Sequence, residues 1–209
     1  MSDRSSVVYI VDDDPSVRRG ISRLVRAAGY QAEVFSSADE FLARSREDRP
    51  GCLVLDVRLP GLSGLDLQER LAGSGRPVPI VFITGRGDIP TSVRAMKAGA
   101  VDFLAKPFEA KALLEAVGQA LSKDAGLRRQ RGEAQALEAR LGHLSARERE
   151  VFALVTAGKM NKQAAMELGI TEKTIKVHRA RVMQKLGAGS LAELVRLADR
   201  VGLSPPDQD

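Results

Sequence analysis

Residues 7–15 read Val7-Val8-Tyr9-Ile10-Val11-Asp12-Asp13-Asp14-Pro15, an apolar run that stops at three aspartates. A continuous apolar run of this kind is typical of a strand buried on both faces of a sheet. Asp14 and Pro15 predict the start of a helix, because aspartate caps the first turn and proline fits its first position. Gly29 predicts the end of that helix. The first two elements predicted along the chain are therefore a buried strand and a helix.

This strand–helix unit recurs through the first half of the chain. Further strands are predicted at residues 31–35, 52–55, 80–84 and 101–105, with helices at 63–72, 89–98 and 109–121 between or after them. Ser37, with Glu40 three residues later, predicts a capping box at the start of one more helix. Five strand–helix units in succession imply a parallel sheet with helices on both faces. We therefore predict an α/β fold with a doubly wound, five-stranded parallel sheet.

The second half of the chain is predicted to be all-α. Segment 123–144 is charged and has apolar residues at heptad-like spacing, which predicts a helix that extends the preceding one. It is either a solvated linker helix or a helix that pairs with a partner's, and the sequence leaves both open. Its apolar positions are Leu127, Ala134, Leu137, Leu141 and Leu144. Four further helices are predicted at residues 146–156, 162–168, 172–186 and 191–201.

Length and composition indicate an ordinary folded protein of two small domains. The chain has 209 residues, of which 28% are charged and 44% hydrophobic. No apolar run approaches the roughly 20 residues of a membrane span, and the first residues lack the layout of a signal peptide, so we expect a cytoplasmic protein. A single cysteine, Cys52, excludes an internal disulfide and is interpreted as a small buried hydrophobic residue.

The excess of positive charge is confined to the second half. Residues 1–122 carry 16 Lys and Arg against 16 Asp and Glu, so they are neutral overall. Residues 123–209 carry 16 against 11 and hold the whole net charge of +5. Such an excess in one half indicates a polyanionic partner for that half.

Acidic residues follow two strands that lie side by side in a parallel sheet of this kind. Asp12 and Asp13 follow the first strand, and Asp56 follows the third. Ligands bind at the carboxyl ends of such strands, so these carboxylates are expected to converge. Two ionised carboxylates about 4 Å apart repel by roughly 4 kcal/mol at an effective dielectric of 20, which predicts a cation between them. All-oxygen ligation favours a hard ion, so Mg²⁺ (or Mn²⁺) is the expected cofactor.

Thr84 and Lys106 add a hydroxyl and an ammonium at the same edge. Thr84 ends the predicted fourth strand and Lys106 follows the fifth, so both point towards the same crevice. The ammonium can neutralise one phosphoryl oxygen and the hydroxyl can donate to another. Each residue alone has an ordinary structural interpretation, and for Asp14 that interpretation is a helix N-cap. Together, a carboxylate nucleophile, a metal, a lysine and a hydroxyl are the parts of an aspartyl-phosphate site.

Residues 7–121 resemble the receiver domain of bacterial response regulators. The segments VVYIVDDD, LVLDVRLPGLSGLDL, IVFITGRGD and KPF (106–108) carry the resemblance, in the family's order and spacing. It implies a flavodoxin-like fold in which Asp56 accepts phosphate from the phosphohistidine of a sensor histidine kinase. The implied Mg²⁺ ligands are Asp13, Asp56 and the backbone carbonyl of Arg58, joined by Asp12 directly or through water.

The same resemblance implies roles for the residues around the acceptor. Lys106 and Thr84 contact the phosphoryl group, and the Lys106–Pro107 bond is cis. Phe103 matches the switch aromatic that moves with Thr84, although from the sequence alone it is also an ordinary core residue. Arg58 and Arg86 occupy the two variable positions beside the pocket. We hypothesise that these two long cations shield the phosphoryl group from attacking water.

Residues 161–186 are predicted to form two helices joined by a tight turn. The turn lies at Gly169-Ile170, and Thr171 is the N-cap of the second helix. The apolar residues of the second helix recur at helical spacing and are expected to face the core: Ile175, Val182, Met183 and Leu186. The residues predicted to be exposed are Lys173, Thr174, Lys176, Val177, Arg179, Ala180, Arg181 and Lys185. A basic helix face suits a major-groove reader, and a solvated charged helix remains the alternative.

Residues 139–202 resemble the LuxR-type helix-turn-helix domain. The resemblance lies in Leu-Ser-x-Arg-Glu at 144–148, Asn-Lys at 161–162 and Thr-Ile-Lys-Val-His at 174–178. It implies that Lys176, Val177 and the Arg179-Ala180 region approach bases, although the family often has a polar or basic side chain where this chain has Ala180. The implied phosphate contacts are Lys162, Thr174, Arg181 and Lys185. Glu148 is interpreted as a structural partner of the recognition helix rather than as a DNA contact.

Together the two halves resemble the FixJ/NarL family of two-component response regulators, and most of all its FixJ-like branch, which includes styrene-catabolism regulators. The resemblance implies a receiver at 7–121, a helical linker at 122–143 and a DNA-binding domain at 139–202. The implied function is phosphorylation-dependent regulation of transcription and not enzymatic turnover, although the receiver promotes phosphotransfer to its own aspartate. Phosphorylation is expected to favour a homodimer, through residues 89–98 and the fifth strand, which binds promoter DNA.

Three other classes of protein each leave half of the sequence unexplained. An aspartate-nucleophile phosphatase needs a second acid two positions after its nucleophile, where this chain has Arg58. A phosphate-relay protein needs no DNA-binding half. A LuxR-type regulator that senses a small molecule has a ligand pocket in place of the aspartate cluster.

Overall fold

The computed structural model describes residues 6–44, 49–73, 77–85 and 89–200. The chain forms two compact units, Met1–Arg128 and Arg129–Asp209. No helix within the described ranges is both long enough and apolar enough to cross a membrane.

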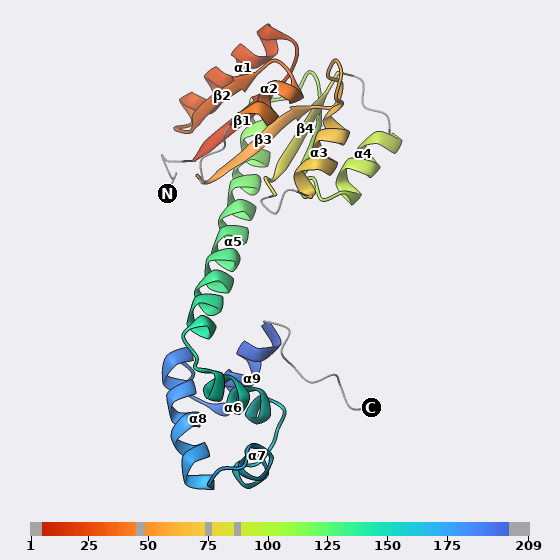
Figure 1. Ribbon diagram of the computed structural model, residues 1–209. Coiled ribbons are helices and arrows are strands. Elements are labelled where there is room, and N and C mark those ends of the chain that lie inside the picture. Colours follow the sequence, from red (N-terminus) through yellow and green to blue (C-terminus); the bar gives the residue numbers. More distant parts are fainter. Residues whose placement is uncertain (1–5, 45–48, 74–76, 86–88, 201–209) are drawn as a thin grey trace. The chain divides into compact units, whose positions relative to one another are not determined.

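The first unit contains the predicted parallel sheet (Figure 1). Its strands lie in the order β2-β1-β3-β4-β5, and every neighbouring pair is parallel. The strands are β1 (Val7–Val11), β2 (Gln31–Phe35), β3 (Gly51–Asp56), β4 (Ile80–Thr84) and β5 (Asp102–Ala105). The helices are α1 (Pro15–Ala27), α2 (Ala38–Ala43), α3 (Gly64–Ala72), α4 (Ile89–Lys97) and α5 (Ala110–Gly142). The predicted α/β fold is confirmed.

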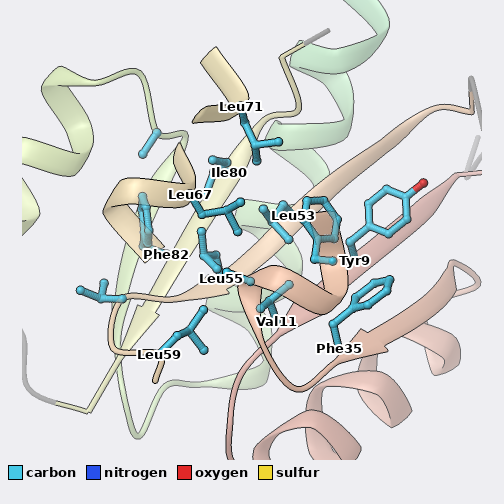
Figure 2. Close-up of a cluster of buried hydrophobic side chains, with 14 of the residues drawn as sticks. Tyr9, Val11, Phe35, Leu53, Leu55, Leu59, Leu67, Leu71, Ile80 and Phe82 are labelled. Atoms are coloured by element: carbon cyan, nitrogen blue, oxygen red, sulfur yellow. The ribbon is translucent and has the colours of Figure 1, made fainter. Parts of the chain in front are cut away.

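Helices cover both faces of the sheet, since β1, β3 and β4 are buried along their whole length. One face packs against α2, α3 and α4, with Leu53 and Phe82 against Leu67 of α3 (Figure 2). The other face packs against α1 and α5 and includes Val54 and Ile83. Successive strand residues alternate between these two cores, which explains why the strands read as unbroken apolar runs.

The helix caps follow the sequence with one exception. Asp14 caps α1, because its Oδ1 accepts from the Ser16 backbone N at 2.7 Å. The Ser37 side chain caps α2 as predicted. The reciprocal half of the predicted capping box is wrong, because the Glu40 carboxylate accepts from the backbone N of Ser36, at 2.6 Å, and not from that of Ser37.

Gly64 lets α3 begin directly against the end of β3. A Cβ atom at Gly64 would lie 2.3 Å from the carbonyl oxygen of Asp56, closer than any side chain can approach. The Gly64 backbone N donates to the Val57 carbonyl at 3.0 Å. This close approach fixes the backbone of Asp56 from the side of α3.

The middle of α5 is tied to the opposite edge of the sheet. The buried carboxylate of Asp124 accepts from the backbone N of Gly51 at 3.0 Å, and from Arg128 Nε at 2.8 Å. Because Gly51 begins β3, this contact joins the helix to the sheet at the end far from Asp56. The compact first unit therefore extends to Arg128.

The last turns of α5 belong to the second unit. Leu137 is 5% exposed, Leu144 lies in the hydrophobic core of that unit together with Val151 and Ile175, and Leu141 packs against the same core. Ala134 is exposed. Packing within the chain therefore buries Leu137 and Leu144 and covers part of Leu141, three of the five heptad-like positions.

The second unit is helical, as predicted. Its elements are α6 (Ala146–Thr156), α7 (Asn161–Leu168), α8 (Glu172–Leu186) and α9 (Leu191–Arg200). Gly169 ends α7 with φ +64°, a left-handed conformation that favours glycine. Thr171 then caps α8 by accepting from the Thr174 backbone N at 3.2 Å. The α7-turn-α8 segment is thus the predicted helix-turn-helix.

Candidate functional site

The predicted site residues meet at the carboxyl edge of the sheet. Asp12 follows β1, Asp56 is the last residue of β3, Thr84 is the last of β4 and Lys106 follows β5. One carboxylate oxygen each from Asp12, Asp13 and Asp56 lie within 4.8 Å of one another. The parallel topology of the sheet therefore brings the carboxylates together, as predicted.

Lys106 bridges the two buried carboxylates. Its Nζ lies 2.6 Å from Asp12 Oδ2 and 2.6 Å from Asp56 Oδ2. Burial disfavours the ammonium, but the hydrogen bonds to Asp12 and Asp56 outweigh it and raise the pKa of Lys106 above its ordinary value. Burial raises the pKa of Asp12, against the opposing hydrogen bond from Lys106. The ammonium thus neutralises part of the charge that the cluster concentrates.

Backbone donors hold the other oxygens of these carboxylates. Asp12 Oδ1 accepts from the backbone N of Asp14 at 2.9 Å, and Asp56 Oδ1 accepts from that of Arg58 at 3.0 Å. Asp12 and Asp56 are buried, whereas Asp13 is exposed. One edge of the cluster therefore faces solvent, which gives a small molecule or an ion access to the carboxylates.

The donor set fits a hard divalent cation. Three carboxylates offer only oxygen ligands within one small volume. Mg²⁺ takes a few carboxylates and completes its shell with water and phosphate oxygens, which an open edge permits. Cysteine and histidine ligands, which suit softer metals, are absent from this cluster.

Thr84 and Phe103 lie on the β4–β5 side of the site. Thr84 is fully buried, and its backbone carbonyl accepts from the Lys106 backbone N at 2.7 Å. Phe103 is half-buried, and its ring centroid lies 6.2 Å from that of Phe82. The Lys106–Pro107 bond is cis, as the resemblance implied. Arg86 lies outside the described residues, so the shielding hypothesis rests on Arg58, whose side chain is exposed.

Sequence reasoning missed two residues that shape the site. Arg18 Nη1 donates to the backbone carbonyl of Asp12 at 2.6 Å and so holds the loop after β1. Gly64 supports the backbone of Asp56. A glycine three residues after Gly61 and an arginine one turn into α1 are common features, and no sequence pattern singles either out.

An apolar groove of about 530 Å³ opens beside the site. Its walls come from α1 and from the segment between β5 and α5. The lining residues are Val17, Gly20, Ile21, Leu24, Lys106, Pro107, Phe108 and Ala110. Lys106 therefore contributes to both the groove and the acidic cluster.

The basic face of α8 is largely as predicted. Lys176, Val177 and Arg181 are exposed, and Ile175 and Val182 are buried. Lys162 is exposed near the start of α7. Thr174 and Arg179 are half-buried rather than exposed, since Arg179 Nη1 reaches Asn161 Oδ1 at 3.4 Å and Thr174 Oγ1 lies 2.8 Å from Thr171 Oγ1.

Lys185 is engaged within the unit. Its Nζ lies 2.6 Å from Glu148 Oε2 and donates to the His143 carbonyl at 3.0 Å. The interpretation of Glu148 as a structural partner of this helix is confirmed. An ammonium has three N–H groups, so one remains for the predicted phosphate contact of Lys185.

The two halves of the chain match two protein families. The response regulator receiver domain matches residues 8–118, and the bacterial regulatory proteins of the luxR family match residues 142–198. The chain is 50% identical over 203 residues to nodulation protein W of Bradyrhizobium diazoefficiens, covering 95% of this chain and 88% of that protein. It is 47% identical over 201 residues to the response regulator protein TodT of Pseudomonas putida, covering 96% and 88%. The solved structure of the response regulator StyR is similar at 51% identity, with a TM-score of 0.81 over 94% of this chain and 99% of that one.

Proposed function

This chain belongs to the two-component response regulators with a LuxR-type DNA-binding half and is a phosphorylation-dependent transcriptional regulator, not an enzyme; we propose that Asp56 is its phosphoacceptor. The observation that carries the proposal is the Lys106 ammonium, which lies 2.6 Å from an oxygen of Asp12 and of Asp56. The proposed receiver covers residues 7–121, the linker 122–143 and the DNA-binding domain 139–202.

The proposed reaction is phosphoryl transfer from a histidine of the sensor kinase. An Asp56 carboxylate oxygen attacks phosphorus, the P–O bond forms as the P–N bond breaks, and the imidazole leaves. The acyl phosphate carries about two negative charges, where the Asp56 carboxylate carried one. Lys106 then exchanges its contact with Asp56 Oδ2 for one with a phosphoryl oxygen, and the Thr84 hydroxyl donates to another. Phe103 moves inward behind Thr84.

Mg²⁺, or Mn²⁺, is the proposed cofactor. Asp12, Asp13, Asp56 and the backbone carbonyl of Arg58 would hold it, with Asp12 acting directly or through water. A divalent cation bound there neutralises charge on the carboxylates and on the phosphoryl oxygens. The protein residues supply the rest: Lys106 orients the acceptor, and the Arg58 backbone N fixes its second oxygen.

The apolar groove beside α1 is the proposed docking surface for the histidine-bearing helix of the kinase. Because Lys106 lines both the groove and the acidic cluster, a helix seated there brings its histidine close to Asp56. Gly20 lies on the groove and has open space around its Cβ position, so a larger side chain fits without strain on the fold. Gly20→Gln should slow phosphotransfer from the kinase but leave phosphorylation by a small donor such as phosphoramidate unchanged. Equal rates with the kinase would refute this surface.

The apolar stripe on α4 is the proposed dimer contact. Ile89, Val93 and Met96 recur at spacings of four and three, so they share one face of the helix. Their exposed fractions are 79%, 45% and 44%, which is unusual for large apolar residues side by side. A two-fold dimer uses the same patch of both subunits and would bury this stripe together with the edge strand β5.

In this proposal dimerisation couples phosphorylation of Asp56 to DNA binding, because the dimer presents two copies of α8 to the two half-sites of a promoter. Bases are the proposed targets of Lys176, Val177 and Arg179. Phosphates are the proposed targets of Lys162, Thr174, Arg181 and the remaining N–H of Lys185. Raising the dimer-competent fraction of the receiver from 1% to 99% would need about 5.5 kcal/mol of differential stabilisation. We therefore propose that phosphorylation shifts this equilibrium only in part and that DNA binding completes the shift. A regulator of this kind acts in the cytoplasm, where promoter DNA lies.

Beryllofluoride, which mimics the acyl phosphate, tests the function on the full chain. We expect it, with Mg²⁺, to raise both the dimer fraction in sedimentation equilibrium and the affinity for promoter fragments. Asp56→Asn is the control and should keep the fold and weak DNA binding while losing both responses. The proposal is wrong if beryllofluoride changes neither the oligomeric state nor the promoter affinity of the parent protein.

A further inference from the structure

Helix α4 is held against the receiver by little buried apolar surface. Ala95 is the one buried residue of its nine described positions, and its large apolar side chains face outward. By contrast, the neighbouring α3 buries Leu67, Gln68 and Leu71 along nine residues. Figure 1 shows these two helices side by side on one face of the sheet. A helix with so few buried contacts depends on its polar contacts to stay in place.

Gln68 of α3 provides the buried polar contact to α4. Its side chain is buried, and its Nε2 donates to the carbonyl oxygens of Ala95 and Ala98, both at 3.2 Å. Ala98 follows the last residue of α4, so no further helical turn supplies a donor to its carbonyl, whereas the Ala95 carbonyl also accepts from the backbone N of Ala100 at 3.1 Å. The second link between the helices, Arg94 to Glu69 at 2.7 Å, joins side chains that are 60% and 61% exposed and holds α4 weakly.

The junction around Gln68 is built loosely. Gln68 Oε1 is buried and has no hydrogen-bond partner within the described part of the chain, which opposes the stabilising effect of the two N–H donors. A pocket of about 70 Å³ borders it and opens to solvent beside the exposed Ala98 and Gly99, so Gln68 lies at the edge of the core. The lining residues of the pocket include Gln68, Leu71, Val78, Ile80 and Ala98. A loosely packed polar junction rearranges at a lower free-energy cost than an interdigitated apolar one.

We propose that Gln68 is a positioning residue that keeps α4 in its unphosphorylated orientation, and that its hydrogen bonds to Ala95 and Ala98 break when α4 moves. The inference rests on the proposed function, in which Thr84 is drawn to the phosphoryl group and α4 carries the dimer stripe. Thr84 ends β4 only five positions before Ile89 begins α4, so its displacement reaches that end of the helix first. Gln68 restrains the opposite end and thereby sets how readily the stripe becomes available.

Gln68→Met tests the restraint, because methionine has a similar length but no donor, and it also removes the unpartnered oxygen. The unphosphorylated variant is expected to dimerise at a roughly 3- to 10-fold lower concentration than the parent, since only the resting orientation loses two hydrogen bonds. Beryllofluoride should then add a smaller increment than it adds to the parent. Sedimentation equilibrium of the full chain measures both constants.

Glu69→Gln is the matched control, since it removes the charge attraction from the exposed link between the same two helices. It should leave both dimer constants within about twofold of the parent, as expected for a surface pair. If the parent dimerises with beryllofluoride and Gln68→Met has the parent's constant without it, the role of Gln68 is refuted. If the parent itself fails to dimerise, the proposed function fails and not the restraint.

A measurement on the parent protein decides the restraint independently, even if Gln68→Met does not fold. In a ¹⁵N-labelled full chain, the side-chain amide protons of Gln68 should exchange slowly with solvent before activation, because they are buried and bonded. Beryllofluoride should speed that exchange, and Asp56→Asn should abolish the change. Equally slow exchange in both states would show that the bonds persist and would overturn the proposal.

Discussion

Lys185 of α8 forms an ion pair with Glu148 of α6, with Nζ 2.6 Å from Oε2. Glu148 is buried, and the same oxygen accepts from the backbone N of Ser145 at 2.8 Å. The Lys185 ammonium also donates to the carbonyl of His143, which lies between α5 and α6. The end of α8 is thereby fixed to the segment through which α5 enters the second unit.

This pair predicts a pH dependence of stability. The hydrogen bond from Lys185 and the backbone N–H of Ser145 lower the pKa of Glu148 from 4.5 to about 2. A group with a lowered pKa contributes stability that is complete above pH 4.5 and is lost as the pH falls from 4.5 towards 2. Urea unfolding of the full chain, followed by helical circular dichroism, should show a smaller loss in Glu148→Gln than in the parent, because Asp14 and Glu40, whose pKa values are also lowered, contribute equally to both proteins. Glu150→Gln, which alters an exposed pair with Arg147, should keep the parent's profile.

Lys106→Met should destabilise the receiver when no divalent cation is present. Removing one partner from a buried ion pair costs about 3–5 kcal/mol, and less here because the Lys106 side chain is 19% exposed. Asp12 and Asp56 would then face each other without a cation. The Tm measured in EDTA should fall below that of the parent. Mg²⁺ should then raise the Tm of Lys106→Met by more than it raises the Tm of the parent.

Lys111→Met provides the comparison, since Lys111 lies on the surface of α5 with a long contact to Glu115 at 3.9 Å. Its Tm should match the parent's in EDTA and in Mg²⁺. If both lysine variants show the same fall in Tm, or Mg²⁺ raises the Tm of neither, then Lys106 does not act by relieving charge repulsion within the acidic cluster.

Gly64→Ala should displace Asp56. The added Cβ would meet the Asp56 carbonyl oxygen at 2.3 Å, and this neighbour is backbone that cannot rotate away. Forcing such a contact costs roughly 1–3 kcal/mol of stability, and we expect slower phosphorylation by phosphoramidate as the acceptor shifts. Gly73→Ala, at the other end of α3, meets only an ordinary contact at 3.8 Å and should behave as the parent. A Gly64→Ala protein with parental rates and unfolding would show that β3 and α3 separate easily.

The sheet and the location of the acidic cluster were predictable because both follow from local pattern and topology. β1, β3 and β4 are buried throughout, so each reads as an unbroken apolar run with a polar residue at or after its end. A parallel sheet then brings those ends together without further information. By contrast, Arg18, Gly64 and Gln68 act through approaches of backbone and side chain that depend on the folded arrangement. Gln68 and Ala95 are 27 positions apart, and no periodicity relates them.

The heptad-like spacing of segment 123–144 shows a different limit. Apolar residues every three or four positions predict that one helix face is buried, and that prediction is confirmed for Leu137 and Leu144. The spacing does not say which surface covers them. In this chain Leu144 lies in the hydrophobic core that α6 to α9 form in the second unit. Packing inside one unit therefore produces the same sequence pattern as pairing between two chains.

Lys176 and Arg181, both exposed on α8, should affect DNA binding in different ways. Lys176→Ala is expected to cost about 1–3 kcal/mol on the operator and much less on unrelated DNA, because a lost base contact removes discrimination. Arg181→Ala should weaken binding to both alike and lower the slope of log K against log salt by about 0.9, the release expected for one phosphate contact. Fluorescence anisotropy between 50 and 200 mM salt, with the beryllofluoride form, measures both quantities. Arg196→Ala, on the exposed surface of α9, should change neither. Loss of discrimination in Arg181→Ala, with a salt effect in Lys176→Ala, would mean that the two residues exchange roles and that α8 lies in the groove with a different rotation about its axis.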